Sequence, residues 1–228
     1  MRKRCAQAGV QEAILPTPAQ RVRSRRLDGT QEAYLIALVC MDEINTQLLA
    51  DARKPLPMEP GKPKREDYEY ERHGVCNVFL ACEPLVGTRV TMTATQQTKQ
   101  EWAEFVRRLA EEHYPAADKI VLVLDNLNTH TLAALYEVFP VAQARRLCQR
   151  FEVHYTPKHG SWLNMAEIEL SALDRQCLSQ RLASYAQAEQ QVAAWTTRRN
   201  QQHITIDWRF TAEDASIKLK HLYPSIKD

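Results

Sequence analysis

Three acidic residues stand where carboxylates could act on a phosphate group. Asp42 and Asp125 each follow an apolar run of strand length, and Glu167 lies in the first turns of a predicted helix. If the two runs are neighbouring parallel strands, both aspartates reach the same edge of a sheet, and the helix brings the glutamate beside them. Three crowded carboxylates repel one another unless a cation lies between them. The pattern is therefore typical of a metal-dependent phosphoryl-transfer site.

The ligand type indicates which metal such a site would hold. Hard oxygen ligands select Mg²⁺, for which Mn²⁺ can substitute. Two such ions, about 3.5–4 Å apart, can activate the attacking oxygen and stabilise the leaving oxygen in an in-line displacement at phosphorus. We therefore expect Asp42, Asp125 and Glu167 to be both the catalytic residues and the metal ligands. The six cysteines form no Cys-x-x-Cys pair, which argues against a structural zinc site.

The two aspartates also have purely structural explanations. Asp125 with Asn126 fits a turn after a strand. Asp42 with Glu43 fits a break between two strands. Each position taken alone is therefore compatible with a residue that has no chemical role.

The third acid has two competing interpretations. Asn164 and Glu167 match a capping box, in which Asn164 caps the helix and Glu167 bonds back to the backbone N–H of the cap. Glu169 is a rival for the third acid, but it lies about 200° around the helix from Glu167. We expect Glu169 to face elsewhere.

The elements that must position these acids indicate an α/β sheet with helices on its faces. Strands are predicted at roughly 35–41, 44–49, 75–82, 88–95, 120–124 and 151–155. Helices are predicted at roughly 98–112, 132–139, 142–150, 161–177 and 185–199. The alternation of helix and strand favours this fold class. Two features are less regular: residues 31–35 favour helix although the following run favours strand, and residues 53–73 form a long proline-rich loop.

The length and charge of the chain suggest two parts. We predict a basic N-terminal remnant or linker at 1–33 and one catalytic domain at 34–228. With 30 Lys+Arg against 28 Asp+Glu the net charge is only +2, so attraction to nucleic acid must come from local clusters. The residues expected to contact DNA are Arg21, Arg23, Arg25, Arg26, Lys62, Lys64, Arg65, Lys158 and His159. A solvated tail and a solvated loop are the alternative interpretation of the basic clusters.

No part of the sequence predicts a membrane protein. No apolar stretch approaches the length of a membrane span, and the basic N-terminus lacks the apolar core of a secretory signal. Several cysteines lie in apolar runs, as buried reduced thiols do. A cytoplasmic protein is therefore expected.

The segments around the acids resemble a known family. Residues 123–130 read VLDNLNTH, and residues 155–169 read YTPKHGSWLNMAEIE. Both resemble the catalytic segments of bacterial insertion-sequence transposases of the mariner-like superfamily, which are DDE enzymes. The similarity extends over roughly residues 39–224. It implies a ribonuclease-H-like fold, in which a mixed sheet is flanked by helices.

The resemblance also implies an activity and its partners. Asp42, Asp125 and Glu167 match the first, second and third acids of the family. Such enzymes cut transposon ends by water attack on phosphodiesters and join the freed 3′ hydroxyl to target DNA, typically at a TA dinucleotide. The implied partners are transposon inverted repeats, a TA-containing target and a second copy of the chain. The implied location is the bacterial cytoplasm, on the nucleoid when DNA is bound.

Several other residues match the family pattern near the acids. They are His130, His159, Ser161, Trp162 and Asn164. A role in positioning DNA or supporting the acids is implied. Trp162 as a core anchor and Asn164 as a helix cap are equally good interpretations.

The chain departs from the family at its N-terminus. Members usually carry two helix-turn-helix modules, whereas residues 2–39 resemble only the region between the modules and the start of the second. An internally deleted copy is expected, with a basic linker at 21–26 of the kind that follows the minor groove and with poor recognition of transposon ends. The alternatives to an active transposase are a non-catalytic DNA-binding or dimerising remnant that competes with intact transposase, and a structure-selective nuclease on the same fold.

Overall fold

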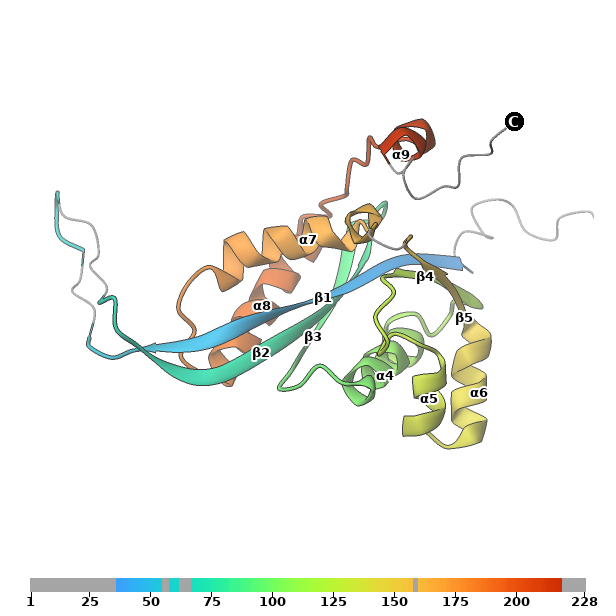
Figure 1. Ribbon diagram of the computed structural model, residues 1–228, viewed down its shortest axis with the longest axis horizontal. Helices are drawn as coiled ribbons and strands as arrows, with labels where there is room; N and C mark the ends of the chain where they lie inside the picture. Colours follow the sequence, from blue (N-terminus) through green and yellow to red (C-terminus); the bar gives the residue numbers. More distant parts are fainter. Residues whose placement is uncertain (1–35, 55–57, 62–66, 158–159, 219–228) are drawn as a thin grey trace, which may run out of the picture. The chain divides into compact units, whose positions relative to one another are not determined.

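A mixed five-stranded sheet forms the centre of the computed structural model, which describes residues 36–54, 58–61, 67–157 and 160–218. The strands are β1 (Ile36–Asp51), β2 (Tyr70–Glu83), β3 (Thr88–Ala94), β4 (Lys119–Leu124) and β5 (Phe151–Tyr155). Their order is β3-β2-β1-β4-β5 (Figure 1). Strands β1, β2 and β3 are antiparallel, whereas β4 and β5 run parallel to β1. The predicted mixed sheet is confirmed by this order and by these strand directions.

Helices cover both faces of this sheet (Figure 1). One face packs against α4 (Lys99–Arg108), α5 (Ala133–Val138) and α6 (Val141–Arg150), and the other against α7 (Ala166–Leu173) and α8 (Tyr185–Gln201). Two helices end in a π-helical turn, α4 in η1 (Leu109–His113) and α7 in η3 (Asp174–Leu178). The 3₁₀ turn η2 (Ser161–Leu163) precedes α7, and α9 (Ala212–Lys218) follows α8. The predicted helices are confirmed, except that the helix expected from Ser161 begins at Ala166 and that α9 was not predicted.

The first strand is longer than its sequence suggested. Two strands were expected, at 35–41 and 44–49, but β1 continues through Asp42 and Glu43 to Asp51. The reason is that β2 pairs with β1 along this whole stretch, from Cys40 opposite Cys82 to Asp51 opposite Tyr70. The pair Asp42-Glu43 therefore lies inside a supported strand and does not break it.

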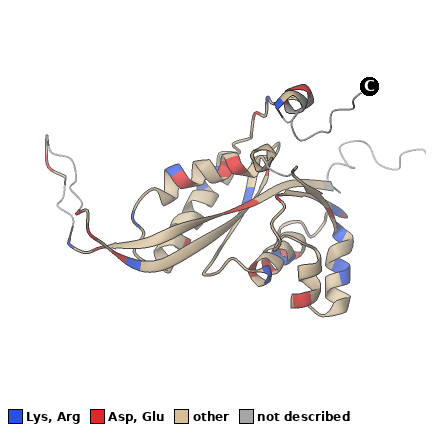
Figure 2. Ribbon diagram, viewed as in Figure 1, with Lys and Arg blue, Asp and Glu red and all other residues tan. Residues whose placement is uncertain are grey.

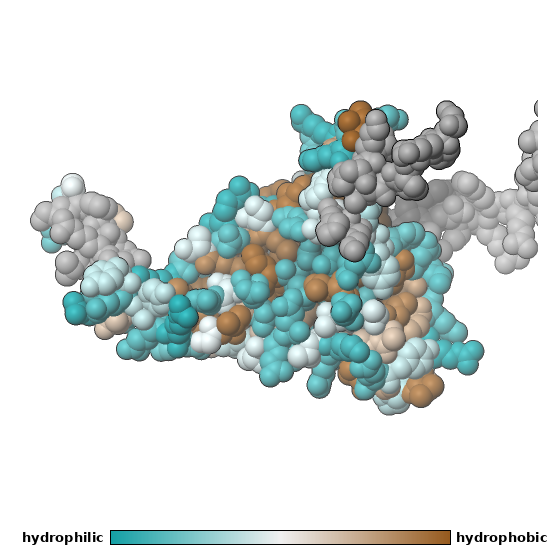
Figure 3. Space-filling view, in the orientation of Figure 1, coloured by the Kyte–Doolittle hydropathy of each residue, from teal (hydrophilic) through white to brown (hydrophobic). Residues whose placement is uncertain are grey.

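Strand alternation divides the apolar core into two layers. On β1, Val39 and Met41 face α4, whereas Cys40 faces α7. The first layer includes the buried side chains of Trp102, Phe105 and Leu122, and the second includes Leu80, Leu173 and Trp195. On the face seen in Figure 3, small groups of hydrophobic residues are interspersed with hydrophilic ones. None of the described helices is long and apolar enough to cross a membrane.

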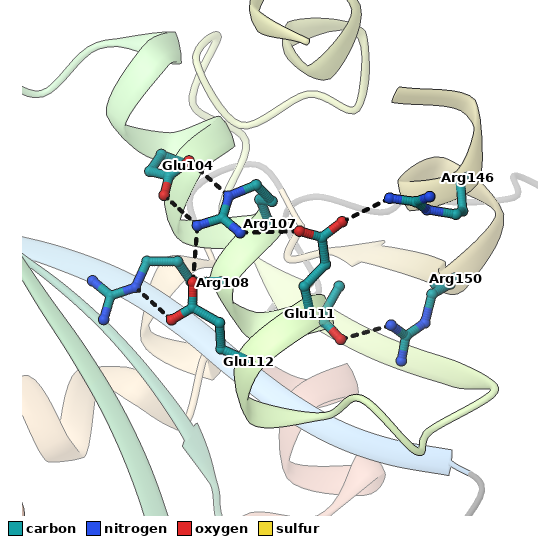
Figure 4. A network of polar contacts seen from close by, with 8 residues as sticks. Glu104, Arg107, Arg108, Glu111, Glu112, Arg146 and Arg150 are labelled. Atoms are coloured by element: carbon teal, nitrogen blue, oxygen red, sulfur yellow. Dashed lines mark hydrogen bonds and ion pairs between the residues drawn. The ribbon is translucent and has the colours of Figure 1, made fainter. Parts of the chain in front are cut away.

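Polar contacts fasten the helices of the first layer to one another (Figure 4). Arg107 pairs with Glu104, Glu111 and Glu112, and Arg146 of α6 reaches Glu111 of η1 at 3.0 Å. Exposed pairs of this kind contribute little individually. Arg150 makes part-buried bonds to the backbone instead, because its guanidinium donates to the carbonyls of Ala110 and Ala117, each at 2.6 Å. These bonds satisfy the carbonyl of Ala110 in η1 and that of Ala117 shortly before β4, and they join the end of α6 to both segments.

One glycine is required by a close approach of two segments. Gly87 ends the turn between β2 and β3 with φ of +78°, and its amide donates to the Glu83 carbonyl at 2.9 Å. A Cβ at this position would lie 2.8 Å from the backbone carbon of His203, which follows α8. Only glycine meets both conditions.

The N-terminal residues 1–35 lie outside the residues that the structure describes. The chain divides between Glu32 and Ala33 into two units, and all of the described residues belong to the second. The domain division at 33/34 therefore stays a prediction.

Candidate active site

The register of the parallel strands brings the first two acids together. The last parallel pair joins Cys40 of β1 to Val123 of β4, and two residues further along each strand are Asp42 and Asp125. Asp125 follows the end of β4, as predicted. Asp42 does not lie at a strand end, which corrects that prediction; it is supported by its antiparallel partner Leu80 on β2. Both aspartates reach the same point of the sheet.

The third acid arrives on α7, which packs against β1 and β2. Its N-terminus is tied to β1 by Asn164, a fully buried residue whose Nδ2 donates to the Met41 carbonyl at 2.7 Å. The same Nδ2 lies 3.4 Å from Oδ2 of Asp42. This tie sets Glu167, three residues on, beside Asp42. Figure 2 shows acidic residues on both β1 and the start of α7.

Glu167 does not form the capping box that offered a structural explanation for it. Asn164 itself bonds the start of the helix, because its Oδ1 accepts from the Ala166 N–H at 3.2 Å. The Glu167 side chain is exposed and makes no hydrogen bond within the described ranges. It is therefore available for another partner.

Glu169 faces away from Glu167, as its position around the helix predicted. Its side chain is 1% exposed and accepts bonds from Arg89 at 2.8 Å and from Arg199 at 3.0 Å. Although burial by itself raises the pKa of Glu169, these two guanidinium groups hold it below its usual range. Glu169 is a structural ion-pair partner that joins α7 to β3 and α8.

The environment of Asp42 disfavours its charge. The pKa of Asp42 is raised to about 7, mainly because the group is buried and also because Glu167, Asp125 and Glu43 are negative. A bond from the Glu43 N–H to Oδ1 of Asp42, at 2.8 Å, opposes this effect. Without a cation, Asp42 is therefore partly protonated near neutral pH.

Asp125 has the opposite behaviour. Burial would raise its pKa, but the bond and the charge of His130 outweigh burial and hold the pKa of Asp125 below its usual value. The Nδ1 atom of His130 lies 2.7 Å from Oδ1 of Asp125. Burial lowers the pKa of His130, yet its bonds to Asp125 and Glu43 raise it to about 9. Asp125 is therefore ionised at neutral pH and His130 is positively charged.

The three carboxylates fit a hard divalent cation in donor type and in charge. All six candidate atoms are oxygens, and Asp42 is destabilised as an anion by the other two acids. As they stand, no three His, Cys, Asp or Glu side chains of the described ranges converge closely enough to hold an ion. Like charges repel when no cation lies between them, which accounts for this separation.

The aromatic residue of the second motif is not a core anchor. Trp162 is only half-buried and meets the ring of Phe210 edge to face at 5.0 Å. The ammonium of Lys218 lies 4.3 Å from the centre of the Trp162 indole. The interpretation of Trp162 as a core residue is therefore wrong, and its partners come from the segment that follows α8. Ser161 is exposed.

The predicted DNA contacts cannot be placed. Arg21, Arg23, Arg25, Arg26, Lys62, Lys64, Arg65, Lys158 and His159 all lie outside the described residues. They stay predictions from the sequence.

Sequence reasoning missed the role of Glu43. Its side chain is 3% exposed and its Oε1 lies 3.3 Å from Nε2 of His130. Strand alternation could have placed Glu43 on the face of β1 opposite to Asp42, but it could not have identified His130 as its partner.

Comparisons with known proteins relate this chain to one family of endonucleases. A family model described as "DDE superfamily endonuclease" matches residues 37–189. No curated protein sequence matches significantly. Among solved structures, a Mos1 transposase paired-end complex with the left transposon end is similar at 13% identity and a TM-score of 0.49, covering 89% of this chain and 66% of that one.

Two further solved structures are similar at 14% identity. They are a Mos1 mariner paired-end complex with Mn, with a TM-score of 0.41, and a Mos1 strand transfer complex, with a TM-score of 0.44. The similarity covers 72% and 75% of this chain and 52% of each of theirs. The chain thus spans less than two thirds of the length of the solved structures that it resembles. The family match, by contrast, extends over more than half of this chain and includes Asp42, Asp125 and Glu167, so the chain belongs to the DDE superfamily endonucleases.

Proposed function

We propose that this chain is the catalytic domain of a DNA transposase that cuts phosphodiesters at transposon ends and transfers the freed strand to target DNA. Asp42, Asp125 and Glu167 would hold the divalent cation. The observation that supports this most is the placement of two acids two residues beyond the last parallel pair of β1 and β4, with the third tied beside them by Asn164. When bound, Mg²⁺ or Mn²⁺ supplies stabilisation of negative charge on the phosphate oxygens.

The three carboxylates would contribute to the cation site in different ways. Asp125 is ionised at neutral pH and supplies a fixed charge at the end of β4. Asp42 is partly protonated before the cation arrives and releases its proton when the cation binds, because a ligand must be deprotonated. Glu167 is exposed on the first turn of α7, where its side chain can rotate toward the other two.

Finer features of the proposal come from the motif resemblance. They are assignment to bacterial insertion sequences of the mariner-like type, binding of transposon inverted repeats and a TA-containing target, two metal ions, and action as a homodimer.

The test is a nicking assay on supercoiled plasmid DNA with Mn²⁺ or with EDTA. We expect the wild-type chain to nick the plasmid only with Mn²⁺, and Asp125→Ala and Asp42→Asn to lose this activity. Asp118→Asn is the matched control, because Asp118 is exposed and lies just before the opposite end of β4. Equal nicking by wild type and Asp42→Asn would remove Asp42 from the site. DNA binding without metal-dependent cleavage would instead favour the non-catalytic remnant that competes with intact transposase.

A further inference from the structure

His130 connects Asp125 to a second carboxylate on the far side of the strand. The imidazole is 1% exposed, with Nδ1 2.7 Å from Oδ1 of Asp125 and Nε2 3.3 Å from Oε1 of Glu43. The three side chains form a line, Asp125 to His130 to Glu43. His130 therefore occupies one oxygen of Asp125 and leaves Oδ2 for another partner.

Glu43 is linked to both aspartates of the site through different groups. Its backbone N–H donates to Oδ1 of Asp42 at 2.8 Å, while its side chain reaches His130 on the opposite face of β1. A single residue thus links Asp42 directly and Asp125 through the imidazole. Because β1 and β4 are held in register by backbone bonds, these contacts fix the Asp125 side chain, directly after β4, relative to the Glu43 side chain on β1.

The surroundings leave the imidazole little freedom. The indole of Trp102 stacks on the His130 ring, with centroids 5.9 Å apart and planes inclined by 24°. The hydroxyl of Tyr155 donates to the His130 carbonyl at 2.8 Å, and the Gln97 amide donates to Oε1 of Glu43. The ring is therefore held at its face by Trp102 and at Nδ1 by Asp125, and Nε2 has an ion-pair contact with Glu43.

This arrangement is poorly explained by stability alone. Oε2 of Glu43 and Nε2 of His130 are buried without a hydrogen-bond partner among the described residues. Buried carboxylates that are incompletely hydrogen-bonded lower the free energy of unfolding. Apolar side chains of similar volume would fill the same space without this loss of stability. A positioning role accounts for a charged pair at this place.

We propose that Glu43 and His130 are positioning residues that hold Asp125 in register with Asp42 for cation binding. The inference rests on the proposed function, because it takes Asp125 as a cation ligand. Residues that orient metal ligands typically change metal affinity by about 10–100-fold when they are replaced.

The experiment is a titration of the full chain with Mn²⁺, in which free Mn²⁺ is measured by electron paramagnetic resonance. We expect Glu43→Ala and His130→Gln to weaken Mn²⁺ binding by roughly 10–100-fold, and the isosteric Glu43→Gln to weaken it less. The Mn²⁺ concentration for half-maximal nicking should rise by the same factor, while the rate at saturating Mn²⁺ stays close to that of wild type. Glu104→Gln, which alters a carboxylate of the network in Figure 4, is the control and should bind as wild type does.

The outcomes separate this inference from the proposed function. Circular dichroism melts identify variants that are unfolded at the titration temperature, and Glu43→Gln decides the result if Glu43→Ala is one of them. Wild-type Mn²⁺ affinity in folded Glu43 and His130 variants, with loss of binding in Asp125→Asn, would overturn the inference and leave the proposed function standing. Absence of both Mn²⁺ binding and nicking in the wild-type chain would overturn both.

Discussion

The chemistry of each acid is decided by what surrounds it, and the pair Glu167 and Glu169 shows this most directly. The two residues are separated by one position on α7, yet one is exposed beside Asp42 and the other is buried between two arginines. Glu169 makes four charge-assisted bonds, whereas Glu167 makes none within the described ranges. One carboxylate is available for chemistry and the other holds the fold.

Matched substitutions of the two glutamates should therefore have opposite effects. Glu167→Gln should change the free energy of unfolding by less than about 0.5 kcal/mol, as exposed substitutions do, and lower metal-dependent nicking by at least about 100-fold. Glu169→Gln should lower the free energy of unfolding by roughly 3–5 kcal/mol, because Arg89 and Arg199 lose their buried anionic partner. Urea titrations and the nicking assay measure the two effects. A destabilised Glu167→Gln with normal nicking would contradict this assignment.

At the residue scale, sequence alone could identify single positions but not their contacts. Asp125 and Glu167 stand out because each sits at a recognisable start or end of an element, and the direction of Glu169 follows from helix geometry. The contact of Glu43 with His130 needs the folded path from β4 back to β1, which no local pattern contains. Trp162 was wrongly taken as a possible core residue because aromatic character does not distinguish burial by the core from contact with a distant segment.

At the scale of elements, the sequence patterns were sufficient to predict a strand or a helix wherever that element packs on one neighbour. Strand β4 and helix α4 are of this kind, since apolar residues define their buried faces. Strand β1 was predicted as two pieces because Asp42 and Glu43 interrupt its apolar run. Its continuation depends on pairing with β2, which is a property of the sheet and is not encoded in the local sequence.

The junction of α7 with β1 is the element contact on which the third acid depends. Asn164→Ala should lower the free energy of unfolding by about 1–3 kcal/mol, because the buried Met41 carbonyl and the Ala166 N–H lose their partner. Nicking should fall further than the loss of folded protein explains, because Glu167 is no longer fixed beside Asp42. Urea titration and nicking rates at a temperature where the variant is folded test this.

A control on the same strand makes that test specific. Asn45 is exposed on β1, and Asn45→Ala should alter the free energy of unfolding by less than about 0.5 kcal/mol. If Asn164→Ala were as active per folded molecule as Asn45→Ala, the tie to β1 would have no part in placing Glu167.

At the scale of the whole molecule, the sheet places a concentration of negative charge beside the start of α7. Asp42 is 8% exposed, and its charge is opposed by burial and by the neighbouring acids. The folded protein without a cation therefore holds a proton on this group that the unfolded chain releases at lower pH. Stability, proton binding and cation binding are consequently linked through one side chain.

This linkage predicts how stability changes with pH. Because the pKa of Asp42 is about 7 in the folded chain and about 3.9 in an unfolded one, the folded state binds more protons between these values. In EDTA, the contribution of Asp42 should therefore lower the free energy of unfolding as pH rises from about 4 to 7. At about 1.4 kcal/mol for each pKa unit, the loss is at most about 4 kcal/mol. Asp42→Asn should lack this loss and be more stable than wild type at pH 7.

Added Mn²⁺ should stabilise wild type but not Asp42→Asn. A cation that binds only the folded state stabilises it by about 2.7 kcal/mol at 100 times its dissociation constant, and deprotonation of Asp42 makes that binding stronger as pH rises. Wild type should gain melting temperature with Mn²⁺ at pH 7 and gain little at pH 5, whereas Asp42→Asn should gain little at either pH. The comparison stops at pH 7 because His130, with a pKa of about 9, loses its own stabilising contribution as pH rises further. Parallel pH profiles of wild type and Asp42→Asn in EDTA would show that Asp42 is not the group that links stability to the cation.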